Sequence, residues 1–172
     1  MKVNKISDEV LYTADSIVRV SSKDIAELTS LAERNSRKRV RLCAHPDSAN
    51  RLHEMLIVLG DGTYIRPHRH PGKSESFHVI SGCVDILLFD DTGKPLEYIE
   101  LGDYSSGKCF YFRIEQQIFH TVILRSDHVV IHETTNGPFN RADTEFASWA
   151  PEEDRINDGN QFLIDTFQQL RG

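Results

Sequence analysis

The stretch RPHRHPGKSESFHVISG, residues 66–82, places three histidines and a glutamate within seventeen positions, as either a metal site or a polar loop could. His68 and His70 are two positions apart, so on a β-strand both imidazoles lie on one face and can reach one ion. A Pro-Gly turn follows, and Glu75 then begins a second strand that brings a carboxylate to the same ion. Two nitrogens and one oxygen on one side leave other coordination positions open, as in redox metal sites that also hold substrate or oxygen.

A fourth ligand must come from elsewhere in the chain. His120 lies in the apolar run IFHTVIL, residues 118–124, where an imidazole without a partner would be costly to bury. A lone histidine in such a run is usually a hydrogen-bonded core residue, but beside a His-x-His and glutamate set we interpret it as a ligand. The sequence therefore predicts one divalent transition-metal ion, and Fe, Mn, Ni, Co, Cu and Zn all suit these ligands.

Composition and charge indicate the general class of protein. A chain of 172 residues with 39% hydrophobic and 27% charged residues is typical of one folded globular domain. A net charge of −6 argues against nucleic-acid binding, because a phosphate backbone would be repelled. Apolar runs are too short to cross a bilayer and the first residues lack the apolar segment of a secretion signal, so we expect no membrane partner and a cytoplasmic location.

The three cysteines, Cys43, Cys83 and Cys109, form neither a Cys-x-x-Cys pair nor an obvious disulfide framework. We interpret them as small buried hydrophobic residues rather than as ligands or nucleophiles.

The middle of the chain reads as short strands separated by turn signals, with no helix among them. Such a pattern favours an antiparallel sandwich or barrel. The predicted strands cover residues 54–59, 63–70, 76–81, 83–89, 96–100, 108–114, 118–124 and 128–134.

The flanking segments are predicted to contain both strands and helices. Residues 10–13 and 17–20 are β-type runs, and a helix capped by a serine follows them and ends near Asn35. Residues 161–170 have helical spacing of their apolar side chains. The tail at residues 145–151 is apolar enough to pack on a sheet or across a dimer, and we favour packing within the chain.

We predict a single domain in three parts. Residues 1–50 form a strand and helix extension that packs on the barrel, residues 51–135 form the barrel core, and residues 136–172 form a tail with a short helix. A basic stretch, residues 34–41, contains five cations that could bind an anionic ligand or partner. Cations beside a helix C-terminus are usually solvated, and we favour that interpretation here.

The motif resembles a known family. From Gly62 to Gly82 the chain reproduces the first cupin motif, G(X)5HXH(X)4E(X)6G, at every position. The resemblance implies an all-β fold, the cupin double-stranded β-helix or jelly roll, here with an N-terminal helix and a short C-terminal helix. It also implies metal ligation by the motif's two histidines and glutamate, His68, His70 and Glu75, together with one histidine from a second motif.

The second cupin motif is degenerate in this chain. Glu115 and Gln117 stand where the family has proline and glycine, and Leu124 stands where it has asparagine. His120 and the aromatic Phe119 before it match the motif.

A narrower resemblance covers residues 10–155. The stretches RLCAHP, LHEMLIVLGDGTYIRPHRH, GKSESFHVISG, LLFDD and HETTNGPFNRADTEFASWAPEED resemble the WbuC-type cupin fold metalloproteins, bacterial proteins of RmlC-like fold often linked to O-antigen or other polysaccharide gene clusters. The resemblance implies a metal at His68, His70, Glu75 and His120.

Function follows from the site as one of three hypotheses. The first is a metal-dependent enzyme, of isomerase, epimerase or oxygenase type, that acts on a small anionic or sugar-derived molecule. The second is a binding module without turnover, and the third is a metal-independent sugar epimerase or isomerase. The expected partners are a small molecule and a second copy of the chain in a homodimer.

Two residues near the motif are candidates for holding substrate. By strand alternation, Tyr64 and Arg66 share the face of the two motif histidines, and a guanidinium there can bind a carboxylate or phosphate. Arg66 is equally well interpreted as a rim residue paired with a surface carboxylate, because Pro67 can break the alternation. His78 lies on the face opposite Glu75, so we predict that it does not bind the metal.

Overall fold

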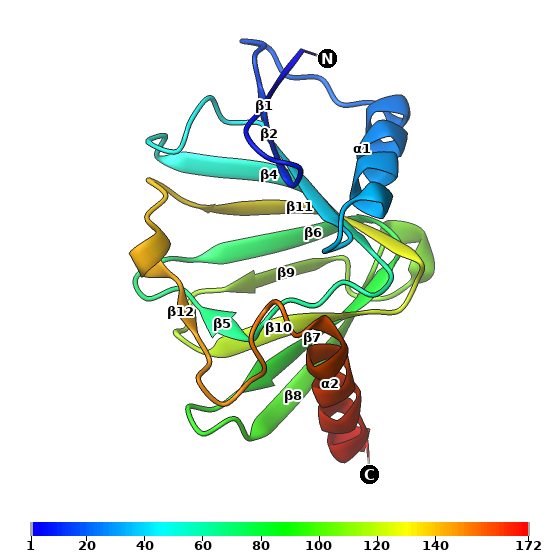
Figure 1. The fold of residues 1–172 in the computed structure, drawn as a ribbon, viewed down its shortest axis with the longest axis vertical. Coiled ribbons are helices and arrows are strands. Elements are labelled where there is room, and N and C mark those ends of the chain that lie inside the picture. The colour runs from blue at the N-terminus through cyan, green and yellow to red at the C-terminus, as the bar shows by residue number, and fades with distance from the viewer. Residues whose placement is uncertain (1, 172) are drawn as a thin grey trace.

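The computed structural model describes residues 2–171 and consists of two β-sheets with one α-helix on the outside of each (Figure 1). The seven-stranded sheet contains, in spatial order, β1 (Val3–Lys5), β2 (Val10–Thr13), β3 (Arg39–Cys43), β4 (Leu52–Gly60), β11 (His128–Asn136), β6 (Glu75–Ser81) and β9 (Tyr111–Ile114). The five-stranded sheet contains β12 (Glu145–Phe146), β5 (His68–Arg69), β10 (Phe119–Leu124), β7 (Cys83–Phe89) and β8 (Pro95–Gly102). The helices are α1 (Ser22–Arg34) and α2 (Ile156–Arg171), and single 3-10 turns are η1 (Tyr104–Ser106) and η2 (Arg141–Asp143).

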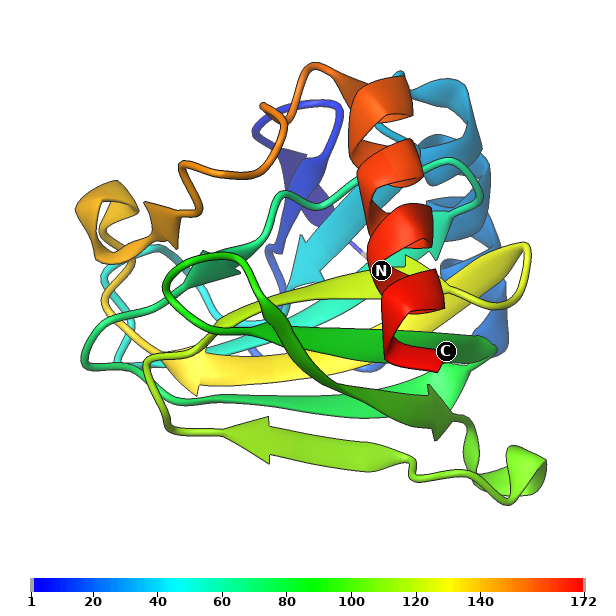
Figure 2. The ribbon, with the colours of Figure 1, turned by 90° about the horizontal axis from the view of Figure 1, so that it is seen from below.

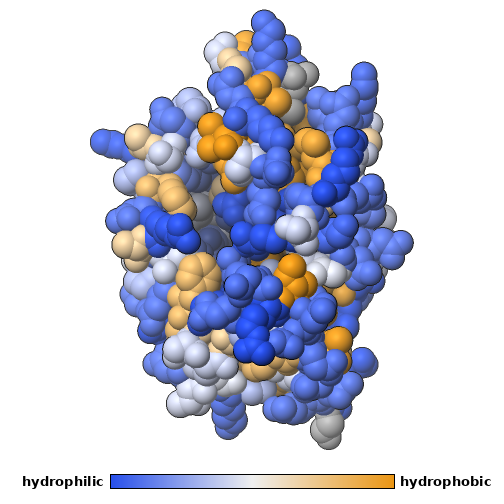
Figure 3. Space-filling model, in the orientation of Figure 1, coloured by the Kyte–Doolittle hydropathy of each residue, from blue (hydrophilic) through white to orange (hydrophobic). Residues whose placement is uncertain are grey.

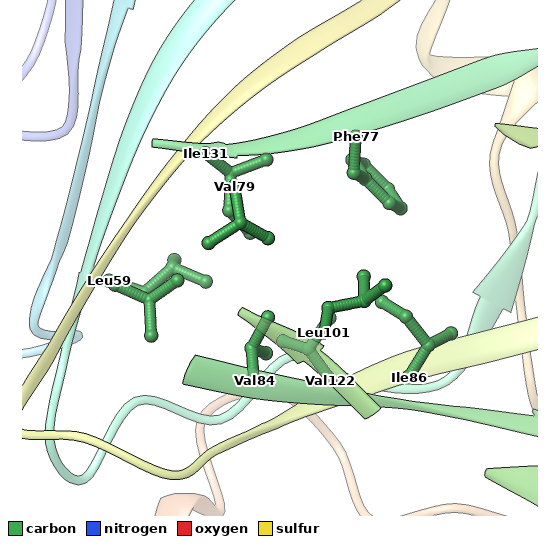
Figure 4. Packing of buried hydrophobic residues seen from close by; sticks show 9 residues of the cluster. Leu59, Phe77, Val79, Val84, Ile86, Leu101, Val122 and Ile131 are labelled. Carbon is green, nitrogen blue, oxygen red and sulfur yellow. The ribbon is translucent and has the colours of Figure 1, made fainter. Parts of the chain in front are cut away.

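The inner faces of the two sheets pack against each other and form the main core. Figure 4 shows Phe77, Val79 and Ile131 of the seven-stranded sheet pointing toward side chains of the five-stranded sheet. The side chains that they face are those of Val84, Ile86, Leu101 and Val122. These inward positions alternate with outward ones along each strand, because successive side chains of a strand point to opposite faces.

Each helix buries the outer face of one sheet (Figures 1 and 2). Leu28 and Ala32 of α1 pack on Val40 of β3 and Val58 of β4. On the other side, α2 packs against β8, and its Leu163 and Phe167 share a cluster with aromatic and aliphatic side chains of β7 and β10. Strand β7 is therefore buried on both faces, which explains why CVDILLF reads as an almost continuous apolar run.

Helix α1 begins where its sequence signals place it. Ser21 is the N-cap residue, and it forms a capping box with Asp24, in which each side chain accepts a hydrogen bond from the other residue's backbone N–H. The helix ends at Arg34, and its C-cap residue Asn35 has an extended backbone. The predicted helix over these residues is thus confirmed.

Gly82 makes the turn between β6 and β7 possible. Its φ angle is +85°, a conformation that residues with a side chain rarely adopt. A Cβ atom at this position would lie 2.3 Å from the carbonyl oxygen of His128, so the turn also has no space for a side chain. The final glycine of the motif is therefore required by both the backbone angle and the neighbouring strand.

The predicted all-β jelly roll with an N-terminal and a C-terminal helix is confirmed, but several elements differ, and the short strands β1 and β12 were not predicted. Residues 17–20 form no strand, and the predicted strand at 63–70 is reduced to His68–Arg69. The basic stretch contains a strand that was not predicted, β3, which pairs with β4 and so extends the sheet of the barrel. Helix α2 begins at Ile156, five residues earlier than predicted.

The core predicts a stability effect that a matched surface position should lack. Leu59 of β4 is 2% exposed in the inter-sheet core, whereas Leu96 of β8 is 49% exposed. We expect Leu59→Ala to lower the free energy of unfolding by about 2–5 kcal/mol, because it leaves a cavity that the sheets cannot close. Leu96→Ala should change it by less than about 1 kcal/mol. Denaturant unfolding of the two variants measures the difference, and equal effects would contradict this assignment of the core.

Candidate metal centre

The four predicted ligands come from both sheets and meet inside the barrel. His68 of β5 and His120 of β10 are directly opposite each other as paired residues of the five-stranded sheet. His70 follows immediately after β5, whereas Glu75 is the first residue of β6 in the seven-stranded sheet. The Pro-Gly turn between them therefore carries the chain from one sheet to the other, and β5 and β6 are not a hairpin.

The donor atoms lie close enough to bind a common ion. One nitrogen from each of His68, His70 and His120 lies within 4.8 Å of the other two. The Glu75 carboxylate lies between two of these rings, with Oε1 3.1 Å from Nε2 of His70 and Oε2 3.2 Å from Nε2 of His120. Two donors about 2.1 Å from one ion and at right angles are about 3.0 Å apart, so these separations suit metal coordination.

Hydrogen bonds to the other nitrogen orient the three rings. Nδ1 of His68 is 2.9 Å from the carbonyl oxygen of Arg66, and Nδ1 of His120 is 3.1 Å from that of Ile118. A carbonyl only accepts hydrogen bonds, so both Nδ1 atoms carry the proton and leave Nε2 as the coordinating atom. Nδ1 of His70 lies 3.3 Å from the hydroxyl of Thr144, which orients the third ring without assigning its proton, because a hydroxyl can donate or accept.

The surroundings of His120 require a positive charge between the ring and Glu75. Its side chain is buried, with 3% of the residue exposed, and its two nitrogens face a backbone carbonyl and the Glu75 carboxylate. Both neighbours are acceptors, so a neutral imidazole can satisfy only one of them. Either a second ring proton or a metal ion between Nε2 and the carboxylate satisfies the other. The residues present thus fit a metal ion.

Burial keeps the histidines in the form that binds metals. The pKa of His68 is lowered to about 3, mainly because burial disfavours the charged ring and also because His120 is close. Burial likewise lowers the pKa of His70. Burial alone would raise the pKa of Glu75, but the hydrogen bond from His120 and the nearby imidazoles outweigh it and hold this pKa below its ordinary value. Two neutral imidazoles and one carboxylate are the protonation states that metal ligation needs.

The donors line one wall of a cavity of about 470 Å³ that is open on one side. Figure 3 shows the face toward the viewer in Figure 1 as mixed polar and apolar, with a recess left of its centre. A cavity of this size is suited to a small molecule. Its other walls come from β3, β4, β11 and the segment after β11, including Phe139, Arg141 and Phe146.

Glu133 of β11 is a second acidic group in this cavity, and it was not among the predicted site residues. Burial, with a smaller contribution from the Glu75 charge, raises its pKa to about 8, and the charge of Arg41 partly opposes this rise. Strand alternation could have located Glu133, because it lies two positions after the buried Ile131 and therefore on the same inward face. A carboxyl group that is protonated near neutral pH is suited to proton transfer.

The structure does not bring Tyr64 and Arg66 to the cavity. Tyr64 is 2% exposed, packs in the cluster beneath α2, and donates a hydrogen bond to the carbonyl of Pro151. Arg66 forms an ion pair with Glu152 and donates from Nε and Nη2 to the carbonyl of Ala147. These contacts match the rim alternative, because residues 63–67 are not a strand and the expected alternation does not hold. Both residues tie the C-terminal segment to the barrel.

Other predictions about single residues have mixed outcomes. His78 is exposed on the outer face of β6, opposite Glu75, as strand alternation predicts. Cys43 is buried, but Cys83 is only half-buried and Cys109 is exposed, so the prediction of three buried cysteines is wrong for Cys109. The tail packs within the chain, with Ala147, Trp149 and Ala150 in the cluster beneath α2.

Two features decide the fold family: two facing sheets, most of whose strands pair antiparallel, and four motif residues converging between them. The chain has the cupin fold. Among solved structures, protein SO0799 from Shewanella oneidensis matches with a TM-score of 0.57 and 13% identity over 88% of this chain and 98% of that one. A likeness at so low an identity shows the fold alone.

Two further cupin-fold matches are partial. An L-ribose isomerase from Cellulomonas parahominis has a TM-score of 0.50 and 17% identity over 64% of this chain and 70% of that one. The capsular polysaccharide assembling protein CapF from Staphylococcus aureus has a TM-score of 0.50 and 21% identity over 65% of this chain and 32% of that one. These two likenesses also extend to the fold and no further.

Comparison of sequences is less informative than comparison of folds. Residues 20–101 match a family model described as a domain of unknown function, DUF6016. No curated protein matches the chain significantly. Within residues 2–171, no helix combines the length and the apolar character needed to cross a membrane.

The raised pKa of Glu133 predicts how the metal-free protein responds to pH. The folded protein keeps a proton on Glu133 between its ordinary pKa of 4.5 and about 8, whereas the unfolded chain has released it. The free energy of unfolding therefore falls as pH rises through this range. We expect Glu133→Gln to remove this loss and to stabilise the metal-free protein at pH 8 by about 1 kcal/mol or more. Thermal or urea unfolding at pH 5 and pH 8 measures it, and an equal effect at both values would contradict the assignment.

The contacts of Arg66 predict a structural role. Arg66→Gln should lower the free energy of unfolding by about 1–3 kcal/mol, because the carbonyl of Ala147 loses its charged donors. Bound metal per chain should stay at the wild-type value. Elemental analysis and urea unfolding of the same preparation separate the two effects. A loss of metal without a loss of stability would contradict the structural role and indicate that Arg66 acts at the metal site.

Proposed function

We propose that this protein binds one divalent transition-metal ion through His68, His70, Glu75 and His120 and acts as an enzyme on a small molecule in the cup. We further propose that it belongs to the WbuC type of cupins, works in the cytoplasm and forms a homodimer. The observation that carries the proposal is the position of His120 between two acceptors, because a metal ion between Nε2 and the Glu75 carboxylate would satisfy both groups.

The cavity beside the donors supports an enzyme. When bound, the metal would supply Lewis-acid or redox chemistry to a substrate held beside it. Glu133 lies in the same cavity and is suited to giving or taking a proton near neutral pH. Thr135, also in this cavity, uses its hydroxyl to donate to the Ser74 carbonyl, so it orders the wall and is not free for chemistry.

The substrate class that we propose is a small anionic or sugar-derived molecule. Two proteins of similar fold are named for carbohydrate roles, an L-ribose isomerase and a capsular polysaccharide assembling protein. Those names agree with a carbohydrate precursor but carry no residue-level argument. The size and the charges of the cavity are the stronger support.

The ligand assignment has a direct test with a matched control. His70→Ala removes a donor that lies 3.1 Å from Glu75, whereas His78→Ala removes a histidine eight positions away on the outer face. We expect His70→Ala to lose at least about half of the metal bound per purified chain, because only three of the four donors remain and the site binds the ion more weakly. His78→Ala should stay at the wild-type value. Elemental analysis measures both, and the reverse pattern would contradict the assignment.

Turnover separates the enzyme from a binding module. Metal-saturated protein is assayed against nucleotide sugars and for oxygen consumption, with Glu133→Gln as the variant and Glu97→Gln, an exposed residue of β8, as its control. An enzyme should lose turnover in Glu133→Gln and on chelation. Tight ligand binding without turnover would favour the binding module, and full turnover after complete chelation would favour a metal-independent epimerase or isomerase.

A further inference from the structure

The cavity contains a second group of charged residues, which lies on the side of β3. Strand β3 alternates between the two faces of the sheet, so Val40 and Leu42 pack against α1 while Arg39 and Arg41 point into the cup. Arg37 precedes the strand and also lines the cavity. The basic stretch at residues 34–41, which we expected to be solvated, therefore forms part of the inner wall of the barrel.

Two of these arginines are already neutralised. Arg39 donates from Nε to Glu9 at 3.1 Å and from Nη2 to Glu153 at 3.2 Å. Arg37 donates to the other oxygen of Glu153 at 2.8 Å. The four residues form a closed network that joins the N-terminal strands to the segment before α2, and this network carries no spare charge for a ligand.

Arg41 differs from its neighbours. It is half-buried in the wall of the cup, and its guanidinium has no hydrogen bond or ion pair with any residue in 2–171. Its charge acts only at a distance, on groups such as Glu133 and Cys43. A half-buried guanidinium without a carboxylate partner is uncommon, because five donors lose part of their hydration and gain nothing in exchange.

The remaining charges of the cavity favour an anion as the missing partner. Lys73 is paired with Asp143 at 3.0 Å, so Arg41 and the mouth residue Arg141 are the unpaired cations of the lining within the described residues. Of the other acids in the lining, Glu75 belongs to the proposed metal site and Glu133 adds at most one negative charge. Once a divalent ion is bound, the interior is positive although the whole chain has a net charge of −6.

We propose that Arg41 is the anion-binding residue of this cup and that its ligand carries a carboxylate or phosphate at the end remote from the metal. This inference rests on the proposed function and specifies its substrate class. Arg41 and Glu75 lie on strands three steps apart, which puts their backbones at least about 14 Å apart along the sheet. A molecule of monosaccharide size spans the space that their side chains leave, with its acidic group on the guanidinium.

The test measures binding of two probes, inorganic phosphate and malonate, to the metal-loaded full chain by isothermal titration calorimetry. Arg41→Gln should weaken binding by at least about tenfold, as expected for a lost charge-assisted hydrogen bond. Arg41→Lys keeps the charge but loses the bidentate geometry, so its affinity for the probes should lie between those of Arg41→Gln and wild type. Arg19→Gln, an exposed arginine outside the cavity lining, should bind as wild type does.

Several results would overturn the proposal. The first is that neither probe binds to the wild-type protein. The second is that Arg41→Gln has the wild-type melting temperature and binds the probes with wild-type affinity. Binding of phosphate but not malonate assigns a phosphate ester, and the converse assigns a carboxylate. If Arg41→Gln does not fold, Arg41→Lys decides, because binding equal to wild type would contradict a role for the bidentate group.

The metal-free protein separates this proposal from the metal site. After chelation, phosphate should still bind more weakly to Arg41→Gln than to wild type, because Arg41 is not among the metal donors. Metal per chain is measured on the same samples. If the protein binds metal but Arg41→Gln binds the probes as wild type does, the metal site stands and the anion-binding role of Arg41 is wrong. If Arg41→Gln weakens probe binding but the protein binds no metal, the anion-binding role stands and the metal site is wrong.

Discussion

The Glu75 carboxylate can remain inside the barrel only because His70 and His120 lie within 3.1 and 3.2 Å of its two oxygens. Burying an isolated carboxylate costs many kcal/mol, and this residue is 6% exposed. His120 lies in the opposite sheet and His70 directly follows that sheet's strand β5, so the interaction also joins the two halves of the sandwich. The centre of the site is thus also a structural contact.

Backbone carbonyls hold the rings in place for this interaction. His68 and His120 bind carbonyls two residues earlier in their own segments, so each strand orients its own ligand. This arrangement leaves little freedom in the site before a ligand arrives, and preorganised donors bind an ion without first paying for their own ordering. Further along the same cavity, Glu133 and Arg41 are not tied in this way, which leaves them available to a substrate.

Much of the fold could be predicted from the strand signals. The predicted strands at 76–81 and 83–89 match β6 and β7 closely, because their turn at Gly82 and their apolar runs are local features. The predicted strand at 63–70 is wrong because only His68 and Arg69 find partners, in β10 and β12. Tyr64 and Arg66 were placed in the cup by that extended strand, and their true partners, Pro151 and Glu152, lie more than eighty residues away.

The sequence by itself indicated an antiparallel sandwich or barrel through its strand and turn signals, and its resemblance to the first cupin motif implied the jelly roll. It also identified the candidate donors His68, His70 and Glu75, because spacing within one short segment limits which side chains can meet. Only the tertiary structure decided that β5 and β6 belong to different sheets and that Glu133 and Arg41 face the same cup. Those facts depend on pairing between strands that are distant in the chain. Strand alternation says which residues share a face, but only the packed sheets say what that face encloses.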